Sequence, residues 1–189
     1  MVILRPVNLR WIRGAADDPK DLCAHGEVAF RIGDDALLDP TSSKEFTVSA
    51  AALYLLRTLS VPHSKDAPVG DRLFPYRLFP CCGFSMFDLA EQEDVVICGC
   101  PNGEDFEVLH EVGAAGVVIR AGDGRKWRVE WPEWRATVFG FADSVSNFYA
   151  TCSPKQPWDE EDRKGFDKFV SEWERRRGLK FGVTILRTT

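Results

Sequence analysis

The alternation of apolar and polar residues predicts the first strands of this chain. Within residues 2–38, apolar side chains repeatedly occupy every second position, most clearly at Val28, Phe30 and Ile32. This period is typical of a strand that buries one face and exposes the other. The pattern therefore places the first strands within residues 2–38.

Three later stretches have the three- and four-residue apolar spacing of α-helices. Residues 47–60 contain strong helix formers and are apolar almost all the way round, which predicts a buried helix. Residues 132–152 begin with Pro132, a residue favoured in the first turn. Residues 159–177 begin with acidic and end with basic side chains, which complements the helix dipole.

The residues from 94 to 112 predict a β-hairpin, because two apolar runs meet at Asn102-Gly103. A two-residue turn there places Cys100 opposite Asp105 and Cys98 opposite Glu107. The carboxylates on this cysteine face cannot all be buried unpaired, so we expect it to look outward or into a groove. The opposite face is expected to pack against the helices, and it collects Val95, Ile97, Gly99, Phe106, Val108, His110 and Val112.

These elements predict an α+β fold, with a mostly antiparallel sheet built from hairpins and packed against about three helices. The hairpins fall within residues 94–131, where Gly122-Asp123-Gly124 gives a second turn signal. The length suits a single globular domain over residues 1–189.

Composition narrows the expected partners and compartment. The net charge of -5 argues against a nucleic-acid-binding protein, which usually carries a clustered basic surface. No apolar run approaches the roughly 18 residues that span a bilayer, and the N-terminus does not resemble a signal peptide. The six cysteines are then interpreted as reduced thiols. We therefore expect a cytoplasmic protein that binds neither membrane nor nucleic acid.

Candidate chemistry is sparse. Zinc held by Cys81, Cys82, Cys98 and Cys100 is one alternative, because four thiolates suit a tetrahedral site. The spacing lacks the usual C-x2-C turn, and cysteine is also an ordinary small apolar residue of protein cores. An enzyme that uses the proline-rich residues 61–83 as an active-site wall is another alternative. No hydrolase, zinc-protease, Walker or dinucleotide motif is present, so no catalytic residue, metal ligand or cofactor is assigned.

The strongest asymmetry of charge lies between residues 88 and 111, which contain eight carboxylates and neither Lys nor Arg. A negative field attracts a basic protein partner, although a solvated acidic surface also keeps an aromatic-rich protein in solution. The predicted partner-binding residues are Asp94, Glu104, Asp105, Glu107 and Glu111.

Four segments resemble, in general character, small cytosolic bacterial immunity proteins, which are encoded beside polymorphic or contact-dependent toxins. The segments are SAAALYLLRTL, LFPCCGFSMF, VVICGCPNGEDFEVLHE and WRATVFGFADSVSNFY. The likeness covers about residues 45–177 and transfers no individual functional residue. It implies a non-enzymatic protein that neutralises a basic toxin domain by direct occlusion, with the acidic surface as the contact.

Overall fold

The computed structural model describes residues 1–12, 16–42, 44–70, 77–81, 84–113 and 115–186. The helices of this described part are α1 (Val48–Arg57), α2 (Trp131–Ala150), α3 (Glu160–Arg177) and the short 3-10 helix η1 (Pro40–Ser42). Its strands are β1 (Val2–Trp11), β2 (Ala24–Ile32), β3 (Asp35–Leu38), β4 (Phe79–Pro80), β5 (Phe84–Phe87), β6 (Val96–Gly99), β7 (Gly103–Glu104), β8 (Phe106–His110), β9 (Gly116–Ala121) and β10 (Lys126–Glu130). The predicted α+β class is confirmed.

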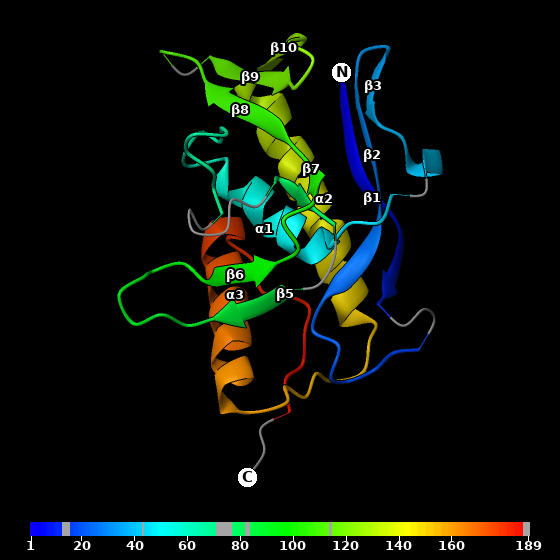
Figure 1. Cartoon of the computed structure of the whole chain (residues 1–189), viewed down its shortest axis with the longest axis vertical. Helices are drawn as coiled ribbons and strands as arrows, with labels where there is room; N and C mark the ends of the chain where they lie inside the picture. Colours follow the sequence, from blue (N-terminus) through cyan, green and yellow to red (C-terminus); the bar gives the residue numbers. More distant parts are fainter. Residues whose placement is uncertain (13–15, 43, 71–76, 82–83, 114, 187–189) are drawn as a thin grey trace.

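The strands form antiparallel sheets around the helices (Figure 1). One three-stranded sheet has the order β1-β2-β3 and the other has the order β10-β9-β8. Two short ladders, β4-β7 and β5-β6, lie between them along the chain. None of the helices in the described part combines the length and apolar character that a bilayer-spanning helix requires.

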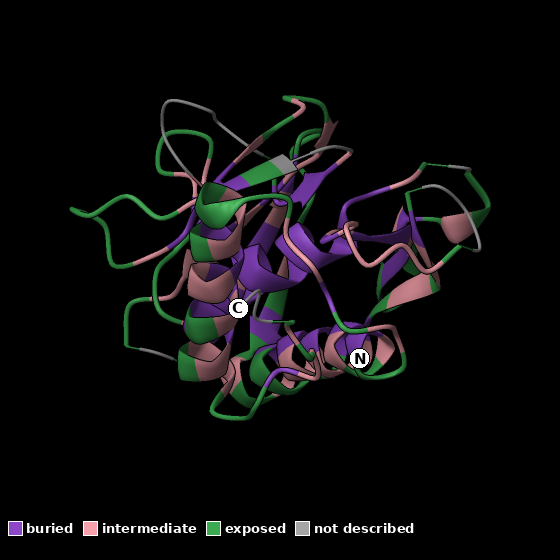
Figure 2. Cartoon of the chain, turned by 90° about the horizontal axis from the view of Figure 1, so that it is seen from below, coloured by how far each residue is buried: buried purple, intermediate pink, exposed green. Residues whose placement is uncertain are grey.

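Helix α1 is the centre of the molecule and contacts α2, α3, β2 and β4. All ten of its residues are buried, as its apolar surface predicts. In Figure 2 the buried residues gather around this helix, and the outer faces of α2 and α3 are exposed. Its one cation, Arg57, is only 5% exposed and forms a buried ion pair with Glu172 of α3.

The helix boundaries follow local signals in the sequence. Asp159 caps α3 by accepting a hydrogen bond from the Asp162 backbone N–H at 2.9 Å. Gly178 ends this helix in the left-handed conformation, with a φ of 74°. The predicted turn at residues 122–124 also forms, because Lys126 of β10 pairs with Arg120 of β9.

The predicted hairpin across residues 94–112 is wrong. Strand β6 pairs with β5, β7 pairs with β4, and β8 pairs with β9, so the expected cysteine–carboxylate register does not form. Among the described non-glycine residues only Asn8 has a positive φ, so Asn102 does not adopt the type I′ turn conformation. Gly103 serves another purpose, because a Cβ atom there would lie 2.2 Å from the Phe79 carbonyl oxygen.

The predicted apolar face is only partly correct. Phe106 and Val108 are buried, as are two of the earlier apolar residues, Val95 and Ile97. Val112, by contrast, is fully exposed beyond the end of β8. The period of two therefore holds from Phe106 to Leu109 in β8, but it fails past the end of that strand and also at Val96 of β6, which is buried.

Replacing Gly165 with alanine should destabilise the packing of α3 on β5. The new Cβ atom would lie 2.0 Å from the Met86 carbonyl oxygen, so one backbone has to move. We expect the free energy of unfolding to fall by about 1–3 kcal/mol in urea denaturation. Gly140→Ala in α2 is the matched control, since nothing lies within 4 Å of its Cβ position. That variant should gain about 0.5–1 kcal/mol, and equal losses in both variants would contradict the packing argument.

Candidate functional site

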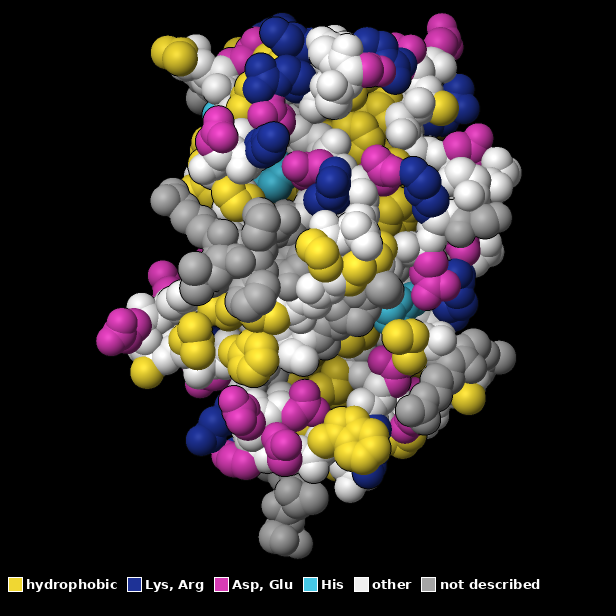
Figure 3. All heavy atoms as spheres, in the orientation of Figure 1, with side chains coloured by type: hydrophobic (Ala, Val, Ile, Leu, Met, Phe, Trp, Pro, Cys, Tyr) yellow, Lys and Arg dark blue, Asp and Glu magenta, His cyan; other side chains and the backbone are white. Residues whose placement is uncertain are grey.

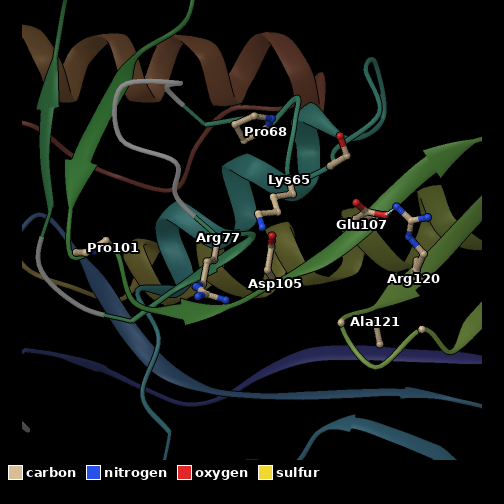
Figure 4. Close-up of a pocket in the computed structure, with 11 residues that line it drawn as sticks. Lys65, Pro68, Arg77, Pro101, Asp105, Glu107, Arg120 and Ala121 are labelled. Carbon is tan, nitrogen blue, oxygen red and sulfur yellow. Dashed lines mark ion pairs between the residues drawn. The ribbon is translucent and has the colours of Figure 1, made fainter.

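An open groove of about 650 Å³ lies between the segment that follows α1 and the strands β8 and β9 (Figure 4). Lys65, Arg77 and Arg120 contribute its cations, and Asp105 and Glu107 contribute its carboxylates. The remaining lining is small or apolar and includes Pro68, Pro101, Ala121, Gly122 and Gly124. The groove brings together five charged side chains from separate segments of the chain, which makes it the candidate functional site.

His63 attaches the segment after α1 to β8. Its backbone exchanges two hydrogen bonds with Val108, each 2.9 Å long. Its ring Nδ1 accepts a hydrogen bond from the Val69 N–H at 3.1 Å, which assigns the proton to Nε2. Nε2 then donates to Asp105 Oδ1 at 2.9 Å. Both ring nitrogens are therefore occupied within the protein.

Asp105 is held as a carboxylate at the base of the groove. Burial alone would raise its pKa, but the hydrogen bonds from His63 and the Leu78 N–H and the nearby charge of Arg77 outweigh it. The pKa of Asp105 consequently lies below its ordinary value. The carboxylate is ionised at neutral pH and has its own donors inside the chain.

Lys65 and Arg77 have no ion-pair partner in the described part of the chain. Both side chains are exposed, and Figure 4 shows them beside Asp105. The other cation of the groove, Arg120, forms an ion pair with Glu107 on the neighbouring strand. Lys65 and Arg77 thus face the groove, and neither forms an ion pair within the described residues.

The five predicted partner-binding carboxylates all lie against a side chain of this protein that can carry positive charge. Asp105 and Glu107 meet in the groove, whereas the other three lie outside its lining. Asp94 bonds to Arg175 and Arg176 of α3 at 2.6 Å each, and Glu111 lies 2.9 Å from Arg128 of β10. Glu104 pairs with Lys44. The acidic stretch is therefore relieved by cations from distant parts of the sequence, and its contact with a partner stays a prediction.

The visible face of the molecule agrees with this pairing. In Figure 3, basic and acidic side chains intermingle over the end of the molecule that carries β8, β9 and β10. The electrostatic potential of this surface is mixed in sign. Such a surface favours particular orientations of a charged partner and does not attract cations in general.

Comparisons of this chain with protein families, curated proteins and solved structures find no match. A function is therefore inferred from the groove and its side chains.

The predicted cysteine group is only partly brought together. The sulfur atoms of Cys81 and Cys100 lie 2.9 Å apart, and Cys82 is outside the described residues. Within those residues, no three His, Cys, Asp or Glu side chains gather in a way that could hold a metal ion. The described thiols thus form a pair and not a tetrahedral set.

Sequence reasoning missed Lys65, Arg77, Arg120 and the orienting role of His63. Lys65 lies in a loop whose residues have no helix or strand period, so no pattern distinguishes it. His63 was visible as one of three histidines, but its pairing with Asp105 spans 42 residues. Only the folded chain reveals that contact.

Replacing Asp105 with asparagine should lower stability in a pH-dependent manner. Removing the charge weakens the hydrogen bonds from His63 and Leu78, and we expect a loss of about 1–3 kcal/mol near neutral pH. Because the folded pKa is lowered, this stabilisation exists above the unfolded pKa of about 3.9 and disappears as the pH falls through the folded value.

Urea denaturation of both proteins near neutral pH and near pH 3 tests this linkage. The difference between the two free energies should be smaller at the acidic pH, and a constant difference would refute the role of the charge. Asp66→Asn is the control, because Asp66 is exposed and has no ion pair within the described residues.

Proposed function

We propose that this chain is a non-enzymatic binding protein of the immunity type, which neutralises a cognate bacterial toxin in the cytoplasm by occluding it. The observation that supports this proposal is the open groove, in which Lys65 and Arg77 form no ion pair with any described residue and Asp105 already accepts hydrogen bonds from His63 and Leu78. Open, charged concavities of this kind suit the capture of a protruding segment of another protein.

The state of the histidine beside the groove favours binding over acid–base catalysis. A general base needs a free nitrogen within reach of the proton that it removes. His63 uses Nδ1 to accept from Val69 and Nε2 to donate to Asp105, and its side chain is only 1% exposed. The His63–Asp105 pair therefore stabilises the position of the groove wall.

The charges of the groove favour an acidic contact from the partner. Three cations and two carboxylates line it, and both carboxylates already have donors or a cation within this chain. A glutamate, aspartate or terminal carboxylate between Lys65 and Arg77 would complete the pairing. This differs from the basic contact that the acidic stretch of the sequence suggested.

Co-expression with the product of the neighbouring reading frame tests the proposal. If that product is toxic when expressed alone, this chain should restore growth and co-purify with it. Hydrogen exchange in the complex should then show protection at residues 64–68 and in β8 and β9. A stable complex that protects only the exposed face of α3 would place the binding site elsewhere.

A further inference from the structure

Two cysteines of this chain lie close enough to react with each other. The Cys81 and Cys100 sulfur atoms are 2.9 Å apart, against about 2.05 Å in a disulfide bond. The separation of the two sulfur atoms therefore exceeds the bond length by less than about 1 Å.

The backbone around the pair is fixed by the β4-β7 ladder. Phe79 pairs with Glu104 and Pro80 pairs with Gly103, and the Cys81 N–H donates to the Asn102 carbonyl at 3.1 Å. The close approach of the two strands requires glycine at position 103. The main-chain pairing thus places Cys81 opposite Asn102, two residues after Cys100.

Neither cysteine of the pair is fully buried. Each residue is partly exposed, and Cys81 lines a shallow cavity of about 330 Å³ beside Lys44 and Gly103. For Cys152, burial raises the pKa of the thiol, and its Sγ donates to the Tyr149 carbonyl. A higher pKa leaves less of the reactive thiolate.

We propose that Cys81 and Cys100 form a site of reversible oxidation, at which a small-molecule disulfide such as oxidised glutathione closes a protein disulfide. One cysteine thiolate attacks the glutathione disulfide and forms a mixed disulfide while the first glutathione thiolate leaves. The second cysteine thiolate then attacks the protein sulfur of that mixed disulfide and expels the second glutathione thiolate. Two protein thiols are oxidised, one glutathione disulfide is reduced to two thiols, and the two cysteine protons pass to the departing thiolates.

The bridge would close a loop that contains β5 and β6. Strand β5 packs closely on α3 at Gly165, so the loop belongs to the folded core. Cross-linking its ends restricts the unfolded chain and should stabilise the native state. The segment just after Cys100 carries Pro101 and Asp105 of the groove, so the bridge also anchors that wall to β4.

Mass spectrometry of protein equilibrated with oxidised glutathione tests the site. The Cys82→Ser variant is used so that the neighbouring thiol cannot be confused with Cys81 in peptide mapping. We expect the intact mass to fall by two hydrogen atoms, a cross-linked peptide that joins positions 81 and 100, and a higher urea midpoint that dithiothreitol reverses.

Further variants distinguish a specific pair from general thiol reactivity. In Cys82→Ser/Cys100→Ser, Cys81 should retain glutathione as a stable mixed disulfide, because the resolving thiol is gone. In Cys82→Ser/Cys152→Ser the bridge should form as before. The proposal is overturned by stable glutathione adducts on both cysteines of the Cys82→Ser protein, by a bridge between other positions, or by thiols that stay reduced under oxidising glutathione.

Discussion

Replacing Glu172 with alanine is expected to lower the free energy of unfolding by about 3–5 kcal/mol, because it leaves a buried guanidinium without its counter-charge. The Glu172 carboxylate lies 2.8 Å from both Nε and Nη2 of Arg57. It also accepts the Val95 N–H at 2.9 Å and Arg176 Nε at 2.6 Å. One carboxylate thus joins α1, α3 and the start of β6.

The Arg57 guanidinium is expected to remain buried, and not to become hydrated, when Glu172 is replaced. Its remaining hydrogen-bond acceptors among the described residues are the carbonyl oxygens of Val69 and Val95, at 2.8 and 2.7 Å. These dipoles stabilise a cation less than a carboxylate does, so the uncompensated charge destabilises the native state. Arg57 is also the last residue of the central helix, and we expect the loss to appear as a single cooperative transition.

Urea denaturation followed by circular dichroism measures the effect. Glu161→Gln is the matched control on the same helix, because Glu161 is exposed without an ion-pair partner among the described residues, and it should change stability by no more than about 0.5 kcal/mol. The double variant Arg57→Met/Glu172→Leu should recover most of the loss, because it removes both buried charges. A double variant less stable than Glu172→Ala would contradict this account of the ion pair.

The charge reversal Lys65→Glu/Arg77→Glu should weaken binding of the cognate toxin by about 100-fold, which corresponds to about 2.7 kcal/mol. The substitutions place two negative charges where we propose that a carboxylate of the partner binds. Both side chains are exposed and lack ion-pair partners within the described residues, so the fold should tolerate the change, although loss of the Arg77 charge should raise the pKa of Asp105. Isothermal titration calorimetry with the product of the neighbouring reading frame gives the affinity.

A control variant with the same net charge distinguishes the effect of the groove on binding from the effect of long-range electrostatics. Arg5→Glu/Arg135→Glu changes the total charge equally, and both residues are exposed on elements that do not line the groove. This control should bind within a few-fold of the wild type near physiological salt, where distant charges are screened. An equal loss in both double variants would show that only net charge matters.

The helices were predictable because their signals are local. The apolar stripe of each helix falls within the helix itself, and for α3 the cap Asp159 and the stop Gly178 directly flank it. The buried character of α1 could also be inferred, because a helix that is apolar on all sides has no surface to expose. Such patterns do not depend on which other element the helix contacts.

The Asn102-Gly103 turn was not predictable, because a distant contact overrides the local preference. Strand β4 pairs with Gly103 and Glu104 and removes them from the expected turn. The charge of the acidic stretch between residues 88 and 111 was not predictable for a similar reason. Its counter-charges come from Lys44, β9, β10 and α3. Counting charges within a segment cannot reveal pairs that only the fold creates.

The most direct test of the groove is a fluorescence-anisotropy titration with a fluorescein-labelled oligoglutamate peptide at low ionic strength. It needs no knowledge of the natural partner, because it tests only whether the groove accepts carboxylates. We predict that the peptide binds the wild type and Arg5→Glu/Arg135→Glu, and that Lys65→Glu/Arg77→Glu loses this binding. Equal affinity of the wild type and Lys65→Glu/Arg77→Glu for the peptide would contradict the proposed site.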